Sequence, residues 1–164
     1  MLEPDRWFHT GDVGVFDQDG YLYITDRKKE LLKTSGGKYV APAPIEGRLN
    51  VHPLIEQSCV IGNKRKYCVA LIVPKFDMLP KWLNRSLPED RGRVVEDPQV
   101  HALFEDAINA VNQDLPSWER VRRFALLSRE FSQETGELTP TQKMKRRVID
   151  EKYKTLIDTL FPAD

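Results

Sequence analysis

The stretch that most constrains the fold of this chain is residues 26–46, DRKKELLKTSGGKYVAPAPIE, which combines basic residues, a glycine pair and two prolines. Gly36 and Gly37 allow a tight or left-handed turn that a side chain would obstruct, and such a turn can bring the backbone close to a ligand. Pro42 and Pro44 fix φ and lack an N–H, which suits the first turn of a helix that begins near Pro44. The stretch therefore predicts two short strands, at residues 30–33 and 38–40, around a turn and followed by a helix.

Charge and cysteine content exclude several classes of protein. Lys+Arg and Asp+Glu are equal at 25 each, which argues against a dedicated nucleic-acid binder. Cys59 and Cys68 form no disulfide framework, and we expect them to be reduced, core-facing strand residues of a cytoplasmic protein. No stretch approaches the ~20 apolar residues of a membrane span, and the N-terminus has no leader pattern, so the chain is predicted to be soluble.

Apolar runs separated by turn residues predict the strands. Residues 7–25 are typical of a β-hairpin with Asp-Gln-Asp-Gly between its strands, and a lone hairpin is marginal in water, so we expect it to belong to a larger sheet. Residues 59–62 and 67–73 predict two further strands. The second of these is almost continuously apolar, as in a strand buried on both faces. Residues 121–127 are another strand candidate.

Helical spacing predicts two short helices and two longer ones. The first begins near Pro44 and is broken near His52-Pro53. A short helix and an irregular excursion occupy residues 77–100, and a helix through residues 100–111 follows the start signal Asp97-Pro98. The last helix is expected from about Met144 to Leu160.

Three segments, in order, resemble the junction between the large and small domains of adenylate-forming enzymes, and among these the long-chain fatty acyl-CoA synthetases look closest. They are WFHTGDVGVFDQDGYLYITDR at 7–27, the stretch at 26–46, and LTPTQKMKRRVIDEKY at 138–153. The resemblance implies that residues 1–28 are the terminal hairpin of a large N-terminal domain. Residues 29–164 would be a mobile α+β C-terminal domain, with a short antiparallel or mixed sheet flanked by helices.

The same resemblance assigns nucleotide-binding and hinge residues. Asp12, in a Thr-Gly-Asp motif, would accept hydrogen bonds from both ribose hydroxyls of ATP, a task that suits two carboxylate oxygens. Arg27 would contact the ribose or a phosphate. From the residues alone, a turn-forming aspartate and a solvated cation explain these positions as well. Lys29 matches the hinge, an assignment that rests on resemblance alone.

The glycine turn matches the part of the family that takes part in thioester formation. Gly36 would line the tunnel for the pantetheine arm of coenzyme A, where a side chain would narrow the passage. Lys33 is a candidate contact for the phosphates of the substrate or of coenzyme A. Lys38 is more simply a solvent-facing strand lysine. A plain hairpin turn would show the same glycine pair.

Lys143 matches the lysine that enters the active site during adenylation. An ammonium on a long stem can follow negative charge as it moves from the α-phosphate to the departing pyrophosphate. Many relatives have glycine immediately before this lysine, whereas this chain has Gln142, which leaves the flexibility of the loop open. The alternative is a solvated basic helix start made of Lys143, Lys145, Arg146 and Arg147.

The implied reaction is the two-step ligation of a fatty acid to coenzyme A through an acyl-adenylate. It uses ATP, coenzyme A and the fatty acid as substrates, with Mg²⁺ expected beside the triphosphate, although no carboxylate cluster in the chain is typical of a metal site. The phosphate loop and acyl tunnel are expected in a preceding domain, so the chain is predicted to be a fragment that is inactive alone. Its main partner would be that domain, and neither an oligomeric state nor an acyl chain length is predicted.

Two alternatives stay open. One is a different adenylate-forming ligase. The other is a stand-alone basic module that binds nucleic acid or anionic lipid through residues 27–38 and 143–147. Neutral net charge and the lack of aromatic residues between the basic ones rank nucleic acid low, while peripheral contact with a membrane is compatible with either function.

Overall fold

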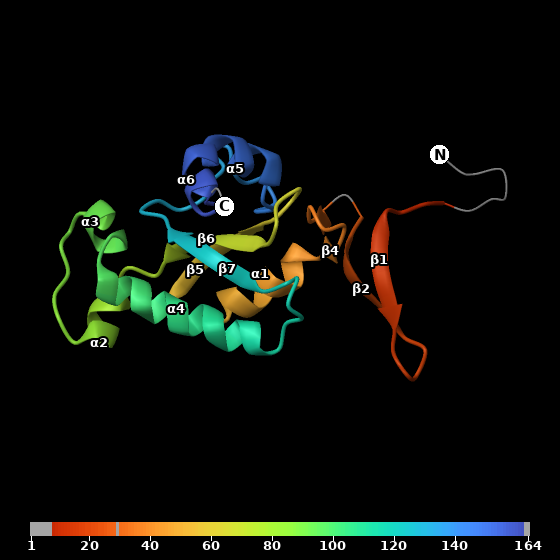
Figure 1. Ribbon diagram of the computed structural model, residues 1–164, viewed down its shortest axis with the longest axis horizontal. Helices are drawn as coiled ribbons and strands as arrows, with labels where there is room; N and C mark the ends of the chain where they lie inside the picture. The colour runs from red at the N-terminus through yellow and green to blue at the C-terminus, as the bar shows by residue number, and fades with distance from the viewer. Residues whose placement is uncertain (1–7, 29, 163–164) are drawn as a thin grey trace.

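A computed structural model describes residues 8–28 and 30–162 and confirms the α+β prediction. Its centre is a mixed three-stranded sheet of β5 (Ile55–Ile61), β6 (Cys68–Pro74) and β7 (Val121–Leu126), in the order β5-β6-β7. The middle strand β6 is antiparallel to β5 and parallel to β7. Helices lie on both faces of this sheet, as Figure 1 shows.

The apolar run of β6 supplies both faces of the sheet. Successive strand residues point to opposite sides, so one set packs into one core cluster and the alternate set into the other. Val69, Leu71 and Val73 belong to the cluster beneath the C-terminal helices, whereas Cys68, Ala70 and Ile72 belong to the cluster on the opposite face. Every residue of β6 is buried, which confirms the prediction of a strand covered on both sides.

Helices α1 (Pro42–Asn50) and α4 (Pro98–Gln113) cover one face of the sheet. The connection from β6 to the parallel strand β7 runs through α2 (Leu79–Leu83), α3 (Arg91–Val95) and α4, as a parallel pair requires a crossover. Asp97 caps α4 and accepts hydrogen bonds from the backbone N–H groups of Gln99 and Val100. The start signal in the sequence therefore marks the true first turn of this helix.

The opposite face is covered by α5 (Arg146–Lys152) and α6 (Lys154–Thr159). The prediction of one continuous helix from residue 144 to 160 was wrong, because Tyr153 interrupts it with φ −100° and ψ 16°. The side chain of Tyr153 lies edge-on to the ring of Phe131, and its hydroxyl donates a hydrogen bond to Glu137. These tertiary contacts fix Tyr153 outside helical geometry.

Two small hairpins precede α1. The first pairs β1 (Asp12–Phe16) with β2 (Leu22–Arg27), and the second pairs β3 (Leu32–Lys33) with β4 (Tyr39–Val40). In Figure 1 the β1–β2 hairpin stands apart from the three-stranded sheet. It leaves large apolar side chains more than half exposed, namely Val15, Phe16, Tyr21, Leu22, Tyr23 and Ile24.

Several element boundaries differ from the predictions by a few residues. Helix α1 begins at Pro42, two residues before the predicted start, because Pro42 rather than Pro44 occupies the first helical position. Strand β5 begins at Ile55, four residues before the predicted start at residue 59, and follows a turn at residues 51–54. Among the described residues, no helix has the length and apolar character needed to cross a membrane.

Candidate functional site

The two predicted nucleotide contacts lie opposite one another in the β1–β2 hairpin. The strand register pairs Asp12 with Arg27. The N–H of Asp12 donates to the hydroxyl of Thr10 at 3.1 Å, and the N–H of Lys28 donates to the carbonyl of Gly11 at 2.7 Å. Gly11 adopts φ +76°, which favours glycine before Asp12. The structure therefore brings these two positions together, while Lys29 lies outside the described residues.

Lys33 and Gly36 belong to the β3–β4 hairpin. Lys33 lies on β3 opposite Tyr39, and its ammonium is 5.5 Å from the centre of that ring. Gly36 is exposed in the turn, and a β-carbon built on it would have no neighbour within 4 Å. The glycine pair thus presents bare backbone to solvent, and Lys33 lies on the adjoining strand, three residues before Gly36.

Hydrogen bonds between neutral groups hold the glycine turn. Thr34 is buried, and its hydroxyl contacts both the N–H and the carbonyl of Lys38. Two backbone hydrogen bonds join this turn to the loop between β5 and β6. The N–H of Ser35 donates to the carbonyl of Arg65 at 2.9 Å, and the N–H of Lys64 donates to the carbonyl of Lys33 at 2.7 Å. Within the glycine pair, only Gly37 has a positive φ, of 78°.

Lys143 projects from a different turn, between β7 and α5. Leu138 and Met144 form an isolated antiparallel bridge, and the N–H of Thr139 donates to the carbonyl of Lys143 at 2.8 Å. The N–H of Lys143 donates in return to the hydroxyl of Thr139 at 3.0 Å. The backbone of Lys143 is therefore fixed on both sides, while its side chain is exposed.

Gln142 occupies the position that makes this turn strained. The N–H of Gln142 donates to the carbonyl of Thr139 at 2.9 Å, which closes a turn through Pro140 and Thr141. Gln142 then adopts φ +60°, a left-handed conformation that side chains disfavour. This is the geometry of a three-residue hairpin loop with a bulge, in which glycine is the usual residue. Glycine would adopt this conformation without strain, whereas glutamine does so at a cost.

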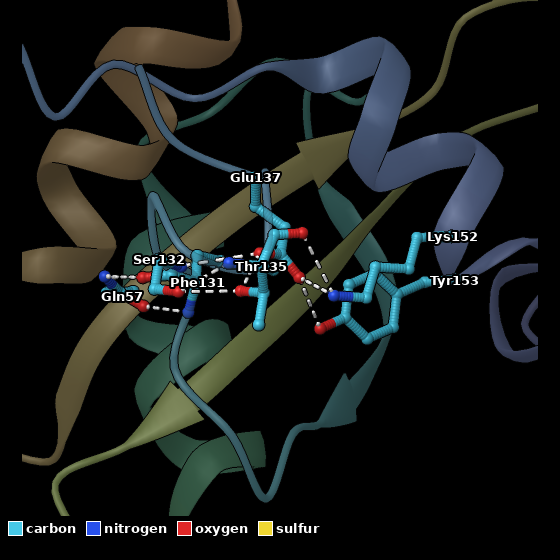
Figure 2. A network of polar contacts seen from close by, with 7 residues as sticks. All are labelled: Gln57, Phe131, Ser132, Thr135, Glu137, Lys152 and Tyr153. Atoms are coloured by element: carbon cyan, nitrogen blue, oxygen red, sulfur yellow. Dashed lines mark hydrogen bonds and ion pairs between the residues drawn. The ribbon is translucent and has the colours of Figure 1, made fainter. Parts of the chain in front are cut away.

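The carboxylate of Glu137 lies at the base of the Lys143 turn and is 1% exposed. The carboxylate accepts hydrogen bonds from the ammonium of Lys152 at 2.5 Å and from the hydroxyl of Tyr153 at 3.3 Å. The hydroxyl of Thr135 is a third donor to the same carboxylate. Figure 2 shows these side chains converging on Glu137. Burial alone would raise the pKa of Glu137, but the hydrogen bonds from Lys152 and Thr135 outweigh it and lower that pKa to about 2. The carboxylate is therefore ionised at neutral pH.

A second, largely buried ion pair joins Arg146, at the start of α5, to Glu46. The guanidinium of Arg146 donates to both carboxylate oxygens of Glu46, at 2.6 and 2.7 Å, and to the carbonyl of Val60. Burial would lower the pKa of Arg146, but hydrogen bonding and attraction from Glu46 outweigh it and raise that pKa. This pair joins the first residue of α5 to α1, because Glu46 lies on that helix.

The basic cluster at residues 143–147 is not one surface. Lys143 and Lys145 are exposed, whereas Arg146 turns inward to Glu46. Arg147 is exposed and pairs with Glu151 on the same helix. Arg146 is therefore not part of the exposed basic surface that a nucleic-acid or anionic-lipid module would use.

The residues that anchor these turns were not predicted from the sequence. Glu137 and Glu46 are buried, although charged residues are usually exposed. The one available signal for Glu46 is its place beside Ile45 and one turn before Leu49, on the side of the helix that faces the core. For Glu137 no local signal exists, since its partners come from residues 132, 135, 152 and 153.

The described residues offer no cluster of three or more His, Cys, Asp or Glu side chains that could hold a metal ion. Cys59 and Cys68 are buried and unpaired on strands, as expected. Burial raises the pKa of Cys59 to about 12 and that of Cys68 to about 11, so both thiols stay protonated at neutral pH.

Comparison with known proteins shows that this chain has relatives among ligases. The long-chain-fatty-acid–CoA ligase FadD15 of Mycobacterium tuberculosis is 40% identical over 160 residues, which cover 96% of this chain and 27% of that protein. The chain therefore spans about a quarter of the length of this relative.

Solved structures show the same fold. The adenylation domain of a carboxylate reductase from Mycobacterium chelonae superposes with a TM-score of 0.79 at 27% identity, covering 98% of this chain and 24% of that one. The corresponding domain from Segniliparus rugosus, in complex with AMP and a carboxylic acid, gives 0.78 at 26% identity with the same coverage. These matches confirm the resemblance to adenylate-forming enzymes.

A family model, described as the AMP-binding enzyme C-terminal domain, matches residues 29–164. It covers most of the chain, including both hairpin residues Lys33 and Gly36 and the Lys143 turn. This chain therefore belongs to the family of AMP-binding enzyme C-terminal domains.

Proposed function

We propose that this chain is the C-terminal part of a long-chain fatty acid–CoA ligase, which activates a fatty acid with ATP and transfers the acyl group to coenzyme A. Family membership and the relative FadD15 support the proposal. The observation that carries it is Lys143, an exposed ammonium on a turn whose backbone is bonded on both sides. That arrangement can deliver a positive charge to a substrate bound by another domain.

The proposed domain division places the boundary at Lys29. Residues 1–28 would complete the sheet of a large N-terminal domain, and residues 29–164 would swivel about Lys29 between the two half-reactions. The exposed apolar side chains of β1 and β2 support this division, because a two-stranded hairpin cannot bury them by itself. The large domain would be the chain's principal partner and would provide the acyl pocket.

In the first half-reaction an oxygen of the fatty carboxylate attacks the α-phosphorus of ATP, and the bond to pyrophosphate breaks. Negative charge builds up on the α-phosphate and on the leaving pyrophosphate. Lys143 would neutralise that charge, a contribution of ~4 kcal/mol for a pair at ~4 Å with an effective dielectric near 20. Asp12 would accept hydrogen bonds from the ribose hydroxyls of the same nucleotide, with Arg27 beside it across the strand pair.

In the second half-reaction the sulfur of coenzyme A attacks the acyl carbonyl, and AMP leaves with the bonding electrons. Gly36 would let the pantetheine arm pass, because it has no side chain and the space around it is open. A β-carbon built on Gly36 would have no neighbour within 4 Å. Lys33, on the adjoining strand, would contact a phosphate of coenzyme A. The two half-reactions would thus use two different turns of the same domain.

Mg²⁺ is expected to accompany the triphosphate, but the part of the chain that the structure describes does not fit it, because no carboxylate cluster is present there. Within the described residues, Lys143 is the group proposed to neutralise the charge that develops during adenylation.

The test separates the half-reactions in the full-length ligase. Lys143→Ala should lower the rate of acyl-adenylate formation by about 100- to 1000-fold, as expected for the loss of about 3 to 4 kcal/mol of charge stabilisation. Thioester formation from supplied acyl-adenylate should be unchanged. Lys145→Ala is the matched control, because Lys145 is also exposed and lies two residues away. Equal loss of both half-reactions would reject the role of Lys143.

Gly36→Leu should give the opposite pattern, with adenylation retained and thioester formation lost. Gly36→Ala provides a graded control, because the turn has space for a methyl group and Gly36 does not have a positive φ. A leucine that leaves thioester formation intact would show that Gly36 does not line the path of the pantetheine arm.

A further inference from the structure

We propose that Glu137 is a positioning residue for Lys143, holding the base of its turn so that the ammonium reaches the nucleotide at a fixed place. The proposal rests on the function proposed above for Lys143. Glu137 touches no substrate in this scheme and acts only through the turn that it anchors.

Glu137 is linked directly to the turn through its backbone. The N–H of Lys145 donates to the carbonyl of Glu137 at 2.7 Å, just outside the bridge between Leu138 and Met144. Together with the two bonds between Thr139 and Lys143, this bond makes a short ladder that ends at Lys143. Any shift of Glu137 therefore moves the base of that ladder.

Hydrogen bonds of its side chain also connect Glu137 to other elements. Its carboxylate is bonded to Lys152 and Tyr153 at the end of α5, and to Thr135 and the N–H of Ser132 in the preceding loop. These partners approach from both sides in Figure 2. One buried carboxylate thus joins the two chain segments that enter and leave the Lys143 turn.

Gln57 and Phe131 connect this network to the central sheet. The amide of Gln57, on β5, donates to the carbonyl of Phe131 at 3.2 Å and accepts from its N–H at 2.7 Å. Phe131 precedes Ser132 and is buried, with its ring edge-on to Tyr153. Figure 2 shows Gln57 at one end of the network and Lys152 and Tyr153 at the other. Contacts therefore run without interruption from the rigid sheet to the turn.

Such an anchor matters because of what a mobile domain must do. A charge that stabilises a transition state has to arrive within a fraction of an ångström of its place, and a misplacement of about 1 Å can cost about 100-fold in rate. Gln142, strained at φ +60°, would relax if the base of the turn loosened. Glu137 prevents that relaxation by fixing both ends of the segment.

The test is Glu137→Gln in the full-length ligase, with Glu134→Gln as the matched control. Glu134 lies in the same loop but is exposed. We expect Glu137→Gln to lower kcat for acyl-adenylate formation by about tenfold or more, since the turn is displaced by part of an ångström. KM for ATP and the rate of thioester formation should stay within about threefold, because other residues determine them.

A double-mutant cycle tells a positioning role from a general loss of stability. In the Lys143→Ala background, Glu137→Gln should add less than about twofold to the loss of adenylation, because the group it positions is gone. If the two losses multiply, or if Glu137→Gln slows both half-reactions equally, Glu137 does not act through Lys143 and the proposal is rejected.

Hydrogen exchange gives a readout that does not depend on catalysis. The amides of Lys143 and Lys145 should exchange faster in Glu137→Gln than in the unchanged protein, while amides of β6 keep their rates. Unchanged exchange at both lysines would overturn the proposal. If Lys143→Ala spares adenylation, the proposed function fails, but the exchange measurement still decides whether Glu137 fixes the turn.

A second variant covers the case in which Glu137→Gln does not fold. Lys152→Ala removes the ion pair from its partly exposed side and leaves Glu137 in place. It should reproduce the selective loss of adenylation and the faster exchange at Lys143 and Lys145. Normal adenylation with unchanged exchange at these amides would reject the positioning role.

Discussion

The turn that carries Lys143 and the turn that carries Gly36 are held by different forces. Beside the Lys143 turn lie two buried ion pairs, Glu137 with Lys152 and Glu46 with Arg146. The Gly36 turn is held by the buried hydroxyl of Thr34 and by backbone bonds to the neighbouring loop. One turn presents a long charged side chain, and the other presents backbone alone.

The difference follows from the group that each turn presents, a lysine ammonium in one and glycine backbone in the other. A lysine has many rotamers, so its reach is defined only if its backbone is fixed, and the ion pairs around the Lys143 turn supply that constraint. A glycine turn needs only space, and bonds between neutral groups suffice to shape it. Even the left-handed residues differ, since the first turn places Gln142 at φ +60° and the second places Gly37 at φ +78°.

The largest expected effect comes from breaking the Glu46–Arg146 pair. Arg146→Met leaves the Glu46 carboxylate, whose side chain is 9% exposed, without its guanidinium partner. We expect the free energy of unfolding to fall by about 3 to 4 kcal/mol, as for other buried pairs that lose one member. Urea unfolding of the protein measures this change.

Arg147→Met is the matched control for that experiment. The side chain of Arg147 is 91% exposed and pairs with Glu151, which is also exposed. Its loss should change the free energy of unfolding by about 0.5 kcal/mol or less. Similar effects for the two arginines would show that the Lys143 turn does not depend on a buried charge.

The next effect is a pH dependence that belongs to Glu137. Its pKa is lowered to about 2 from an ordinary 4.5, so the native state favours the ionised carboxylate. This contribution to stability is fully present above pH 4.5 and is lost as the pH falls toward 2. We expect it to be about 2 kcal/mol, since solvent at the 41% exposed Lys152 side chain screens the pair.

Urea unfolding of the unchanged protein and of Glu137→Gln, between pH 2 and pH 6, measures this contribution. The two should differ most above pH 4.5 and converge toward pH 2, because glutamine does not titrate. Glu134→Gln, at an exposed position, should keep the full pH dependence. A constant difference between the unchanged protein and Glu137→Gln would contradict the assignment.

The smallest expected effect is a reciprocal exchange of the two left-handed residues. Gly37→Gln should destabilise the protein by about 1 kcal/mol, the cost of a side chain at positive φ. Gln142→Gly should stabilise it by about 0.5 kcal/mol, because relief of strain exceeds the added freedom of glycine in the unfolded chain. Thermal unfolding of both variants gives the sign of each change.

Gly36→Gln is the control for that exchange. Gly36 is adjacent to Gly37 but does not have a positive φ, and a β-carbon there meets no other atom within 4 Å. It should change the free energy of unfolding by about 0.5 kcal/mol or less. If Gly36→Gln and Gly37→Gln are equally destabilising, strain at positive φ does not distinguish the two positions.

Much of the fold was readable from the sequence because it depends on local patterns. The unbroken apolar run of β6 predicted a strand buried on both faces, and Asp97-Pro98 predicted the start of α4. The glycine pair predicted a turn between two short strands. The break at Tyr153 was not predicted, since helical spacing continues through it and its cause is contact with Phe131 and Glu137.

The candidate site divides in the same way. The sequence by itself predicted the turn that contains Gly36, because turn chemistry is a property of neighbouring residues, whereas it placed Lys143 just before the last helix and not in a turn. Only the tertiary structure decided that Glu137 and Glu46 are buried and Arg146 half-buried while Lys143 is exposed. A charged side chain is buried only where a partner compensates its lost hydration, and Glu46 and Arg146 are separated by 100 positions in the chain.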